Sequence, residues 1–86
     1  MSRRDKLLRR FLSGPADFRF DEMSRLLEDL GYQKMPSGRT AGSRVAFLDR
    51  KSGHIIRLHR PHPGNTVKKY QMELIEDALR ARGLIK

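Results

Sequence analysis

The sequence contains no cysteine and no tryptophan among its 86 residues. Without cysteine the chain can form neither a disulfide framework nor a thiolate metal site, which fits a reducing cytosol. Long apolar runs are also missing, and Met1 to Lys6 lead into an amphipathic stretch instead of the apolar segment of a signal peptide. We therefore expect a cytoplasmic protein without a membrane span.

The small size of the chain limits its architecture. A chain of this length builds one modest core and buries a smaller fraction of its surface than a large domain does. The sequence shows no internal repeat, low-complexity segment or linker. We therefore expect residues 1–86 to form a single domain without a deep enclosed pocket.

Acidic residues are scarce in the middle of the chain, and this scarcity accounts for most of the net charge of +9. Residues 31–72 contain nine Lys or Arg and one acid, Asp49, whereas the flanking segments are nearly balanced. Unopposed positive charge in a segment with strand periodicity indicates a surface for a polyanion, nucleic acid above all. The plainer interpretation is a solvated basic surface.

Apolar spacing predicts two helices in the first third of the chain. The first covers residues 3–12, with a capping box from Ser2 and Asp5, and ends at Ser13-Gly14-Pro15. The second begins with Asp21 as its N-cap and ends at Gly31. The expected core-facing side chains are Leu7, Leu8, Phe11 and Leu12 in the first helix, and Met23, Leu26, Leu27 and Leu30 in the second.

Three strands follow. The sequence predicts a short strand over residues 32–35, a loop over 36–42, and a hairpin of residues 44–49 and 54–60 around a turn that contains Gly53. With a four-residue turn, Asp49 faces His54 and Arg44 lies across from His59. With a turn of four or of two residues, alternation assigns Val45, Phe47, Ile56 and Leu58 to the core face, and Arg44, Ala46, Arg57 and His59 to the other face. A three-residue turn with a bulge would exchange the two faces.

The last helix is predicted to begin between Asn65 and Lys69 and to end at Gly83, followed by an extended tail over residues 84–86. From residue 21 onward the order is α-β-β-β-α. We therefore predict an α+β fold, with a three-stranded antiparallel sheet and two helices on one of its faces. This is the layout of the double-stranded RNA-binding fold, here with an extra N-terminal helix.

Several motifs in this order resemble the HicA family of bacterial toxins. They are Gly42-Ser43-Arg44 before the second strand, His62-Pro63-Gly64 after the third, the step Val67-Lys68-Lys69, and Gly83-Leu84 at the end of the last helix. The resemblance covers residues 20–86 as a HicA-like core and leaves residues 1–19 as an N-terminal helical extension.

The resemblance implies a toxin that binds and cleaves messenger RNA without a metal or other cofactor, and that a HicB-like antitoxin neutralises. It also implies a departure at the site of chemistry. Family members have Gly-Ser-His where this chain has Gly42-Ser43-Arg44, and that histidine is the catalytic residue. The candidate RNA-binding residues are Arg39, Ser43, Arg44, Arg57, Lys68 and Lys69.

Cleavage of RNA without a metal requires a base for the 2′-hydroxyl proton, cations beside the phosphate and an acid for the leaving oxygen. Arginine stays protonated, so Arg44 can serve only as a phosphate clamp or transition-state cation. His59 is the best replacement base, and we expect Arg44, Arg57 and Arg60 to lower its pKa. His62 is the second catalytic candidate.

Each histidine also has a structural alternative, since His59 can simply pair with its sheet neighbours and His62 can brace the Pro-Gly turn. Alternation puts His54 and His59 on opposite faces of the sheet, which argues against a metal site. Three hypotheses therefore remain: a ribonuclease toxin, an RNA-binding module without catalysis, and a basic surface that docks an acidic protein. All proposed site residues require that the N-terminal helix does not cover the open face of the sheet.

Overall fold

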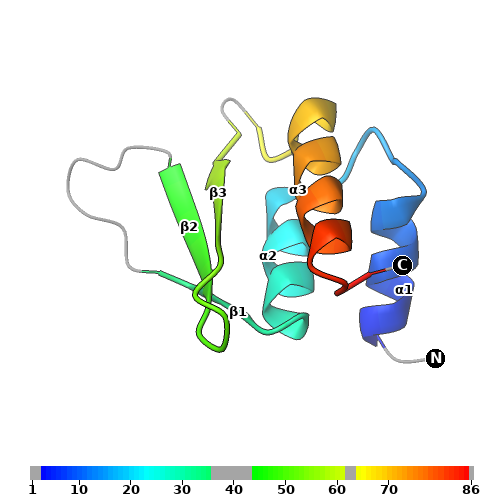
Figure 1. Cartoon of the computed structure of the whole chain (residues 1–86). Helices are drawn as coiled ribbons and strands as arrows, with labels where there is room; N and C mark the ends of the chain where they lie inside the picture. The colour runs from blue at the N-terminus through cyan, green and yellow to red at the C-terminus, as the bar shows by residue number, and fades with distance from the viewer. Residues whose placement is uncertain (1–2, 36–43, 62–63, 86) are drawn as a thin grey trace.

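The computed structural model describes residues 3–35, 44–61 and 64–85, and three helices and three strands lie in these ranges (Figure 1). In chain order they are α1 (Arg3–Leu12), α2 (Phe20–Asp29), β1 (Tyr32–Lys34), β2 (Arg44–Asp49), β3 (Ile55–His59) and α3 (Lys69–Ala81). The predicted α+β class and the order of the elements are confirmed.

The strands form one antiparallel sheet in the order β1-β2-β3. Arg44 pairs with His59 and Leu48 with Ile55, while the backbone N–H of Asp49 donates to the carbonyl of His54 at 2.9 Å. The turn therefore has four residues, and the predicted register of the hairpin is confirmed.

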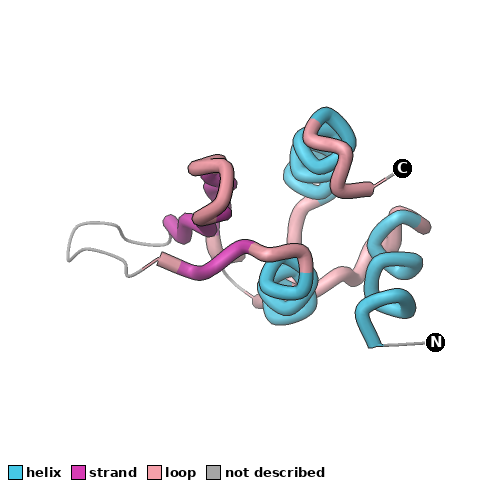
Figure 2. Tube along the Cα trace, turned by 60° about the horizontal axis from the view of Figure 1, so that its bottom comes forward, coloured by secondary structure: helices cyan, strands magenta, loops and turns pink. Residues whose placement is uncertain are grey.

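The elements are arranged in three layers. Figures 1 and 2 show the sheet on one side, α2 and α3 in the middle, and α1 beyond them on the side away from the sheet. The ring of Phe11 in α1 packs at 5.5 Å from that of Phe18, which precedes α2. No described helix therefore covers the open face of the sheet, as the predicted site residues require.

The core lies between the sheet and the helices, and α1 adds to it from the outer side. Its buried apolar side chains are Phe11, Phe18, Phe20, Met23, Leu26, Leu27, Tyr32, Val45, Phe47, Ile56, Leu58, Val67, Met72, Ile75, Leu79 and Ile85. All four strand residues expected on the core face are buried. Leu12, expected on the apolar face of the first helix, is 37% exposed at the end of α1.

The predicted N-cap of α2 is wrong. The helix begins at Phe20 with Arg19 as its N-cap, and Asp21 is its second residue. The carboxylate of Glu22 accepts a hydrogen bond from the backbone N–H of Arg19 at 3.0 Å, which anchors the start of the helix before Asp21. Asp21 and Glu22 then lie in the first turn, where acidic groups interact favourably with the helix dipole.

Glycines end α2 and α3 as predicted. Gly31 has a φ of 102° and Gly83 a φ of 74°, conformations that side chains with a Cβ rarely adopt. After α3 the N–H of Gly83 donates to the carbonyl of Arg80, and that of Leu84 donates to Leu79. These two bonds form a Schellman motif that turns the chain back, so that Ile85 is buried.

A hydrogen-bonded network joins the hairpin turn to the end of α3. The guanidinium of Arg82 donates to the Asp49 carboxylate at 2.7 Å, to the Ser52 hydroxyl at 2.6 Å and to the Tyr32 hydroxyl at 2.5 Å. The Tyr32 hydroxyl also lies 2.7 Å from Nδ1 of His54. The hydrogen bond from Arg82 holds the pKa of Asp49 below its ordinary value, so this carboxylate stays charged near the core.

Candidate nucleic-acid interface

The open face of the sheet carries the cationic end of the hairpin. Arg44 is the first residue of β2 and lies directly across from His59, the last residue of β3. Ala46 pairs with Arg57 one step further along, so Arg57 shares this face with His59. Arg44, Arg57 and His59 are all exposed. The predicted juxtaposition of these three side chains is confirmed.

This face has no acid among its described residues. Alternation and pairing assign to it Gln33, Met35, Arg44, Ala46, Leu48, Arg50, Ile55, Arg57 and His59. The ion pairs formed within the described parts of the chain join Arg10 to Asp17 and Glu22, Arg80 to Glu76, and Arg82 to Asp49. The guanidiniums of Arg44 and Arg57 therefore face solvent without an acidic partner in these ranges, which suits a phosphate ligand.

Arg60 does not face His59 as expected. It follows β3 on the core side of the alternation, and its guanidinium lies over the Phe20 ring, 5.2 Å from the ring centroid. Phe20 opens α2, on the helix side of the sheet. The cations that share a face with His59 are thus Arg44 and Arg57, and Arg60 belongs to a different surface.

Lys68 and Lys69 lie at the start of α3, on the helix side of the sheet. Lys68 is the N-cap without a side-chain capping bond, Lys69 is the first helical residue, and both are exposed. The first turn of α3 contains no acid. Because a helix N-terminus carries partial positive charge, two lysines there are unfavourable until an anion neutralises them. Figure 1 shows this helix start at the same end of the molecule as the end of β3.

Three of the predicted site residues, Arg39, Ser43 and His62, lie outside the described ranges. Among the other five, Arg44, Arg57 and His59 come together on the open face of the sheet, whereas Lys68 and Lys69 stand at the start of α3. The described part of the predicted site is therefore divided between two surfaces that meet at one end of the domain.

The remaining histidine, His54, contacts Tyr32 and not His59. Its Nδ1 lies 2.7 Å from the hydroxyl of Tyr32, whose side chain is buried. The predicted placement of His54 and His59 on opposite faces is confirmed. Within residues 3–35, 44–61 and 64–85, no group of three His, Asp or Glu side chains could hold a metal ion.

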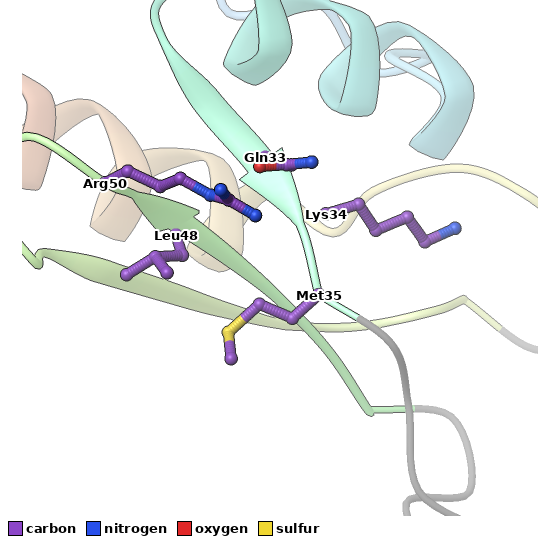
Figure 3. Close-up of a pocket in the computed structure, with 5 residues that line it drawn as sticks. All are labelled: Gln33, Lys34, Met35, Leu48 and Arg50. Atoms are coloured by element: carbon purple, nitrogen blue, oxygen red, sulfur yellow. The ribbon is translucent and has the colours of Figure 1, made fainter.

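A shallow hollow of about 280 Å³ on the open face was missed by the sequence-based predictions (Figure 3). Gln33, Lys34, Met35, Leu48 and Arg50 line it, and Figure 3 shows the Lys34 side chain extending away from Leu48 and Arg50. The sequence indicated this apolar surface, because Leu48 is two residues after Ala46 in the same strand and must therefore lie on the same face of the sheet, away from the core. Apolar surface therefore lies beside the cations on this face.

Comparisons with protein-family models, with curated proteins and with solved structures found no match to this chain. In the part of the chain that the structure describes, no helix combines the length and the apolar character needed to cross a membrane.

Proposed function

We propose that this protein is a HicA-like toxin that binds messenger RNA and cleaves it as a metal-independent endoribonuclease, and that a HicB-like antitoxin neutralises it in the cytoplasm. The observation that carries the proposal is the direct pairing of Arg44 with His59 on an exposed face whose described residues include no acid. The order α2-β1-β2-β3-α3 also supports it, since a double-stranded RNA-binding-like fold has this layout.

In the proposed reaction His59 is the base. Its neutral imidazole takes the proton from a ribose 2′-hydroxyl, and the 2′-oxygen attacks the adjacent phosphorus. As the bond from phosphorus to the 2′-oxygen forms, the bond to the 5′-oxygen breaks, leaving a 2′,3′-cyclic phosphate. The 5′-oxygen leaves as a hydroxyl after taking up a proton, for which His62 is the candidate donor.

The two arginines beside His59 stabilise charge in this scheme. Arg44 and Arg57 present guanidinium groups, which donate several hydrogen bonds in a planar fork that matches phosphate oxygens. A guanidinium group donates hydrogen bonds and has no acceptor, so neither arginine serves as the base in this scheme. Their role is to hold the phosphodiester and to stabilise the negative charge that grows on it in the transition state.

One observation favours a second candidate function. Arg44 occupies the position at which the resembled family has its catalytic histidine, and an arginine there strengthens phosphate binding while removing a base. On this alternative the chain is an RNA-binding module that does not cleave.

The test is cleavage of a labelled RNA by purified protein in EDTA, with folding of every variant checked by circular dichroism. We expect the wild type to cut the RNA, His59→Ala to bind but not cut it, and Arg44→Ala to bind it weakly. His54→Ala is the matched control, because it removes a histidine of the same hairpin on the other face. His62→Ala tests the proton donor.

Each other result has a definite meaning. Intact RNA in all reactions, with salt-sensitive binding that weakens in Arg44→Ala, would establish the non-catalytic module. Neither binding nor cleavage, together with tight association with an acidic protein, would leave only a protein-docking surface. In cells, growth arrest on expression that His59→Ala relieves would support the toxin.

A further inference from the structure

Two cations from opposite edges of the sheet meet at one aromatic ring. Lys34 ends β1 and Arg60 follows β3, the two outer strands of the sheet. The Nζ of Lys34 lies 5.7 Å from the centroid of the Phe20 ring, and the guanidinium carbon of Arg60 lies 5.2 Å from it. The two charges are therefore separated by no more than the sum of these distances.

This convergence carries an electrostatic cost. The upper limit of their separation is only slightly longer than the Debye length of about 8 Å at physiological ionic strength, so salt screens the repulsion between the two positive charges only in part. No acid pairs with either side chain among the described residues. The Phe20 ring offsets part of this repulsion through cation–π contacts, and a bound anion would remove it.

The ring itself is not available to a ligand. Phe20 is 3% exposed, so neither a base nor another aromatic group can stack on it. Lys34 and Arg60 are exposed, and the ammonium and guanidinium groups both lie within cation–π distance of the ring. What this part of the surface can bind is therefore an anion and not a planar apolar group.

The position of Phe20 connects this cation pair to the start of α3. The backbone N–H of Phe20 donates to the carbonyl of Asn65 at 2.7 Å, and that of Val67 donates to Phe18 at the same distance. The segment bonded in this way leads directly into Lys68. The pair and the two lysines of α3 therefore belong to neighbouring segments on the helix side of the sheet.

We propose that Lys34 and Arg60 form a phosphate-binding point for the backbone of RNA, separate from the open-face site at Arg44 and His59. The fork of Arg60 donates to one or two phosphate oxygens, and the ammonium of Lys34 approaches from the other edge strand as a point charge. The proposal rests on the proposed function for the identity of its ligand. In this proposal the two residues increase the affinity for RNA and guide its backbone across the surface, and they take no part in the chemistry.

The test compares two doubly substituted proteins. Lys34→Met with Arg60→Gln removes the charges and keeps part of the stems that cover Phe20. Lys6→Met with Arg25→Gln removes two exposed cations that line one hollow between α1 and α2, away from the sheet. Both proteins lose the same net charge. A difference in RNA binding between them therefore depends on where the removed charges lie and not on the overall charge.

Two measurements are made on each protein. In the first, inorganic pyrophosphate is titrated into ¹⁵N-labelled protein, and the Nε–H signal of Arg60 is followed by NMR. In the second, binding of a short RNA is measured as a function of KCl concentration. We expect a saturable shift of the Arg60 signal in the wild type. We also expect the slope of log K against log[KCl] to be smaller in magnitude by about 0.7–0.9 in the Lys34/Arg60 protein than in the wild type. Cleavage at saturating RNA should be unchanged.

The outcomes separate this proposal from the proposed function. If pyrophosphate moves the Arg60 signal while RNA does not bind, the anion site stands and the proposed function fails. If RNA binds and is cut, but the slope for the Lys34/Arg60 protein equals that of the Lys6/Arg25 protein and pyrophosphate leaves Arg60 unmoved, the proposed function stands and this inference is wrong.

Discussion

The two ends of the β2–β3 hairpin differ in how their charged side chains are paired. At the turn end Asp49 is buried, and Arg82 donates to it and to two neighbouring hydroxyls. At the open end Arg44 and His59 are exposed and face each other without an acid in the described residues. At the turn end the buried Asp49 carboxylate is paired internally and stabilises the fold, whereas at the open end the cationic side chains are exposed to solvent.

The largest expected effect distinguishes the histidines at the two ends of β3. We expect His59→Ala to lower the cleavage rate by about 10²–10⁴-fold, because proton transfer by a positioned group contributes that much. His54→Ala should leave the rate within a few fold and destabilise the fold by about 1 kcal/mol, since the Tyr32 hydroxyl loses a partner. Single-turnover cleavage and urea unfolding measure the two effects.

The control for this comparison is RNA affinity, which should change little in either histidine variant. If His54→Ala abolished cleavage while His59→Ala retained it, the assignment of stability to the turn end and chemistry to the open end would be reversed.

The second prediction concerns the pH dependence of stability at the turn end. The hydrogen bond from Arg82 lowers the folded-state pKa of Asp49. The resulting stabilisation is fully present above the unfolded pKa of about 3.9 and is lost as the pH falls through the lower folded value. We therefore expect the wild type to lose stability more steeply than Asp49→Asn between about pH 4 and pH 2.

Thermal unfolding monitored by circular dichroism across this pH range measures the difference. Glu73→Gln is the matched control, because it neutralises an exposed acid of α3 that forms no ion pair among the described residues. Parallel pH profiles for the wild type and Asp49→Asn would show that the Arg82 contact contributes no pH-dependent stability.

The third prediction compares two arginines on the open face, one near each end of the hairpin. Arg44 begins β2 beside His59, and Arg50 follows β2 beside the hollow lined by Leu48. We expect Arg44→Ala to weaken RNA binding about tenfold, the value of one hydrogen bond to a charged group. Arg50→Ala should weaken it by less than threefold. Fluorescence anisotropy at fixed salt measures both, and equal losses would mean that RNA is held by the whole face.

Much of the fold could be predicted because its signals are local and repetitive. The alternation of Val45, Phe47, Ile56 and Leu58, together with the length of the turn, determined both faces of the hairpin and the pairing of Arg44 with His59. The error at the start of α2 has a physical cause. A good N-cap residue, Asp21, occurs two positions after the residue that Glu22 actually caps.

The side-chain contacts that the sequence did not reveal join residues far apart in the chain, both at the turn end and beside the candidate site. Arg82 reaches Asp49 across 33 positions, and no periodicity in the sequence relates these two residues. Arg60 was expected beside His59 because the two are adjacent, but alternation continues past β3 and places its guanidinium over Phe20. Pairing can be deduced from spacing, whereas the destination of a long side chain depends on which partners the tertiary fold brings near.

The smallest expected effect tests whether a lysine at the start of α3 lowers the stability of the fold while it contributes to RNA binding. Lys69 lies in the first turn of α3, where the helix dipole disfavours a cation and favours an acid. We expect Lys69→Glu to stabilise the fold by about 0.3–1 kcal/mol and at the same time to weaken RNA binding. Lys6→Glu is the matched control for charge reversal, because Lys6 is an exposed residue of α1, the helix that lies on the side of α2 and α3 away from the sheet (Figure 1).

Urea unfolding and RNA titration on the same preparations measure the two effects. A rise in stability together with a loss of affinity would mean that Lys69 contacts the RNA and lowers the stability of the fold. If Lys69→Glu gained stability and bound RNA as tightly as Lys6→Glu, the start of α3 would lie outside the RNA path. The ligand surface would then be confined to the strand ends at Arg44 and His59.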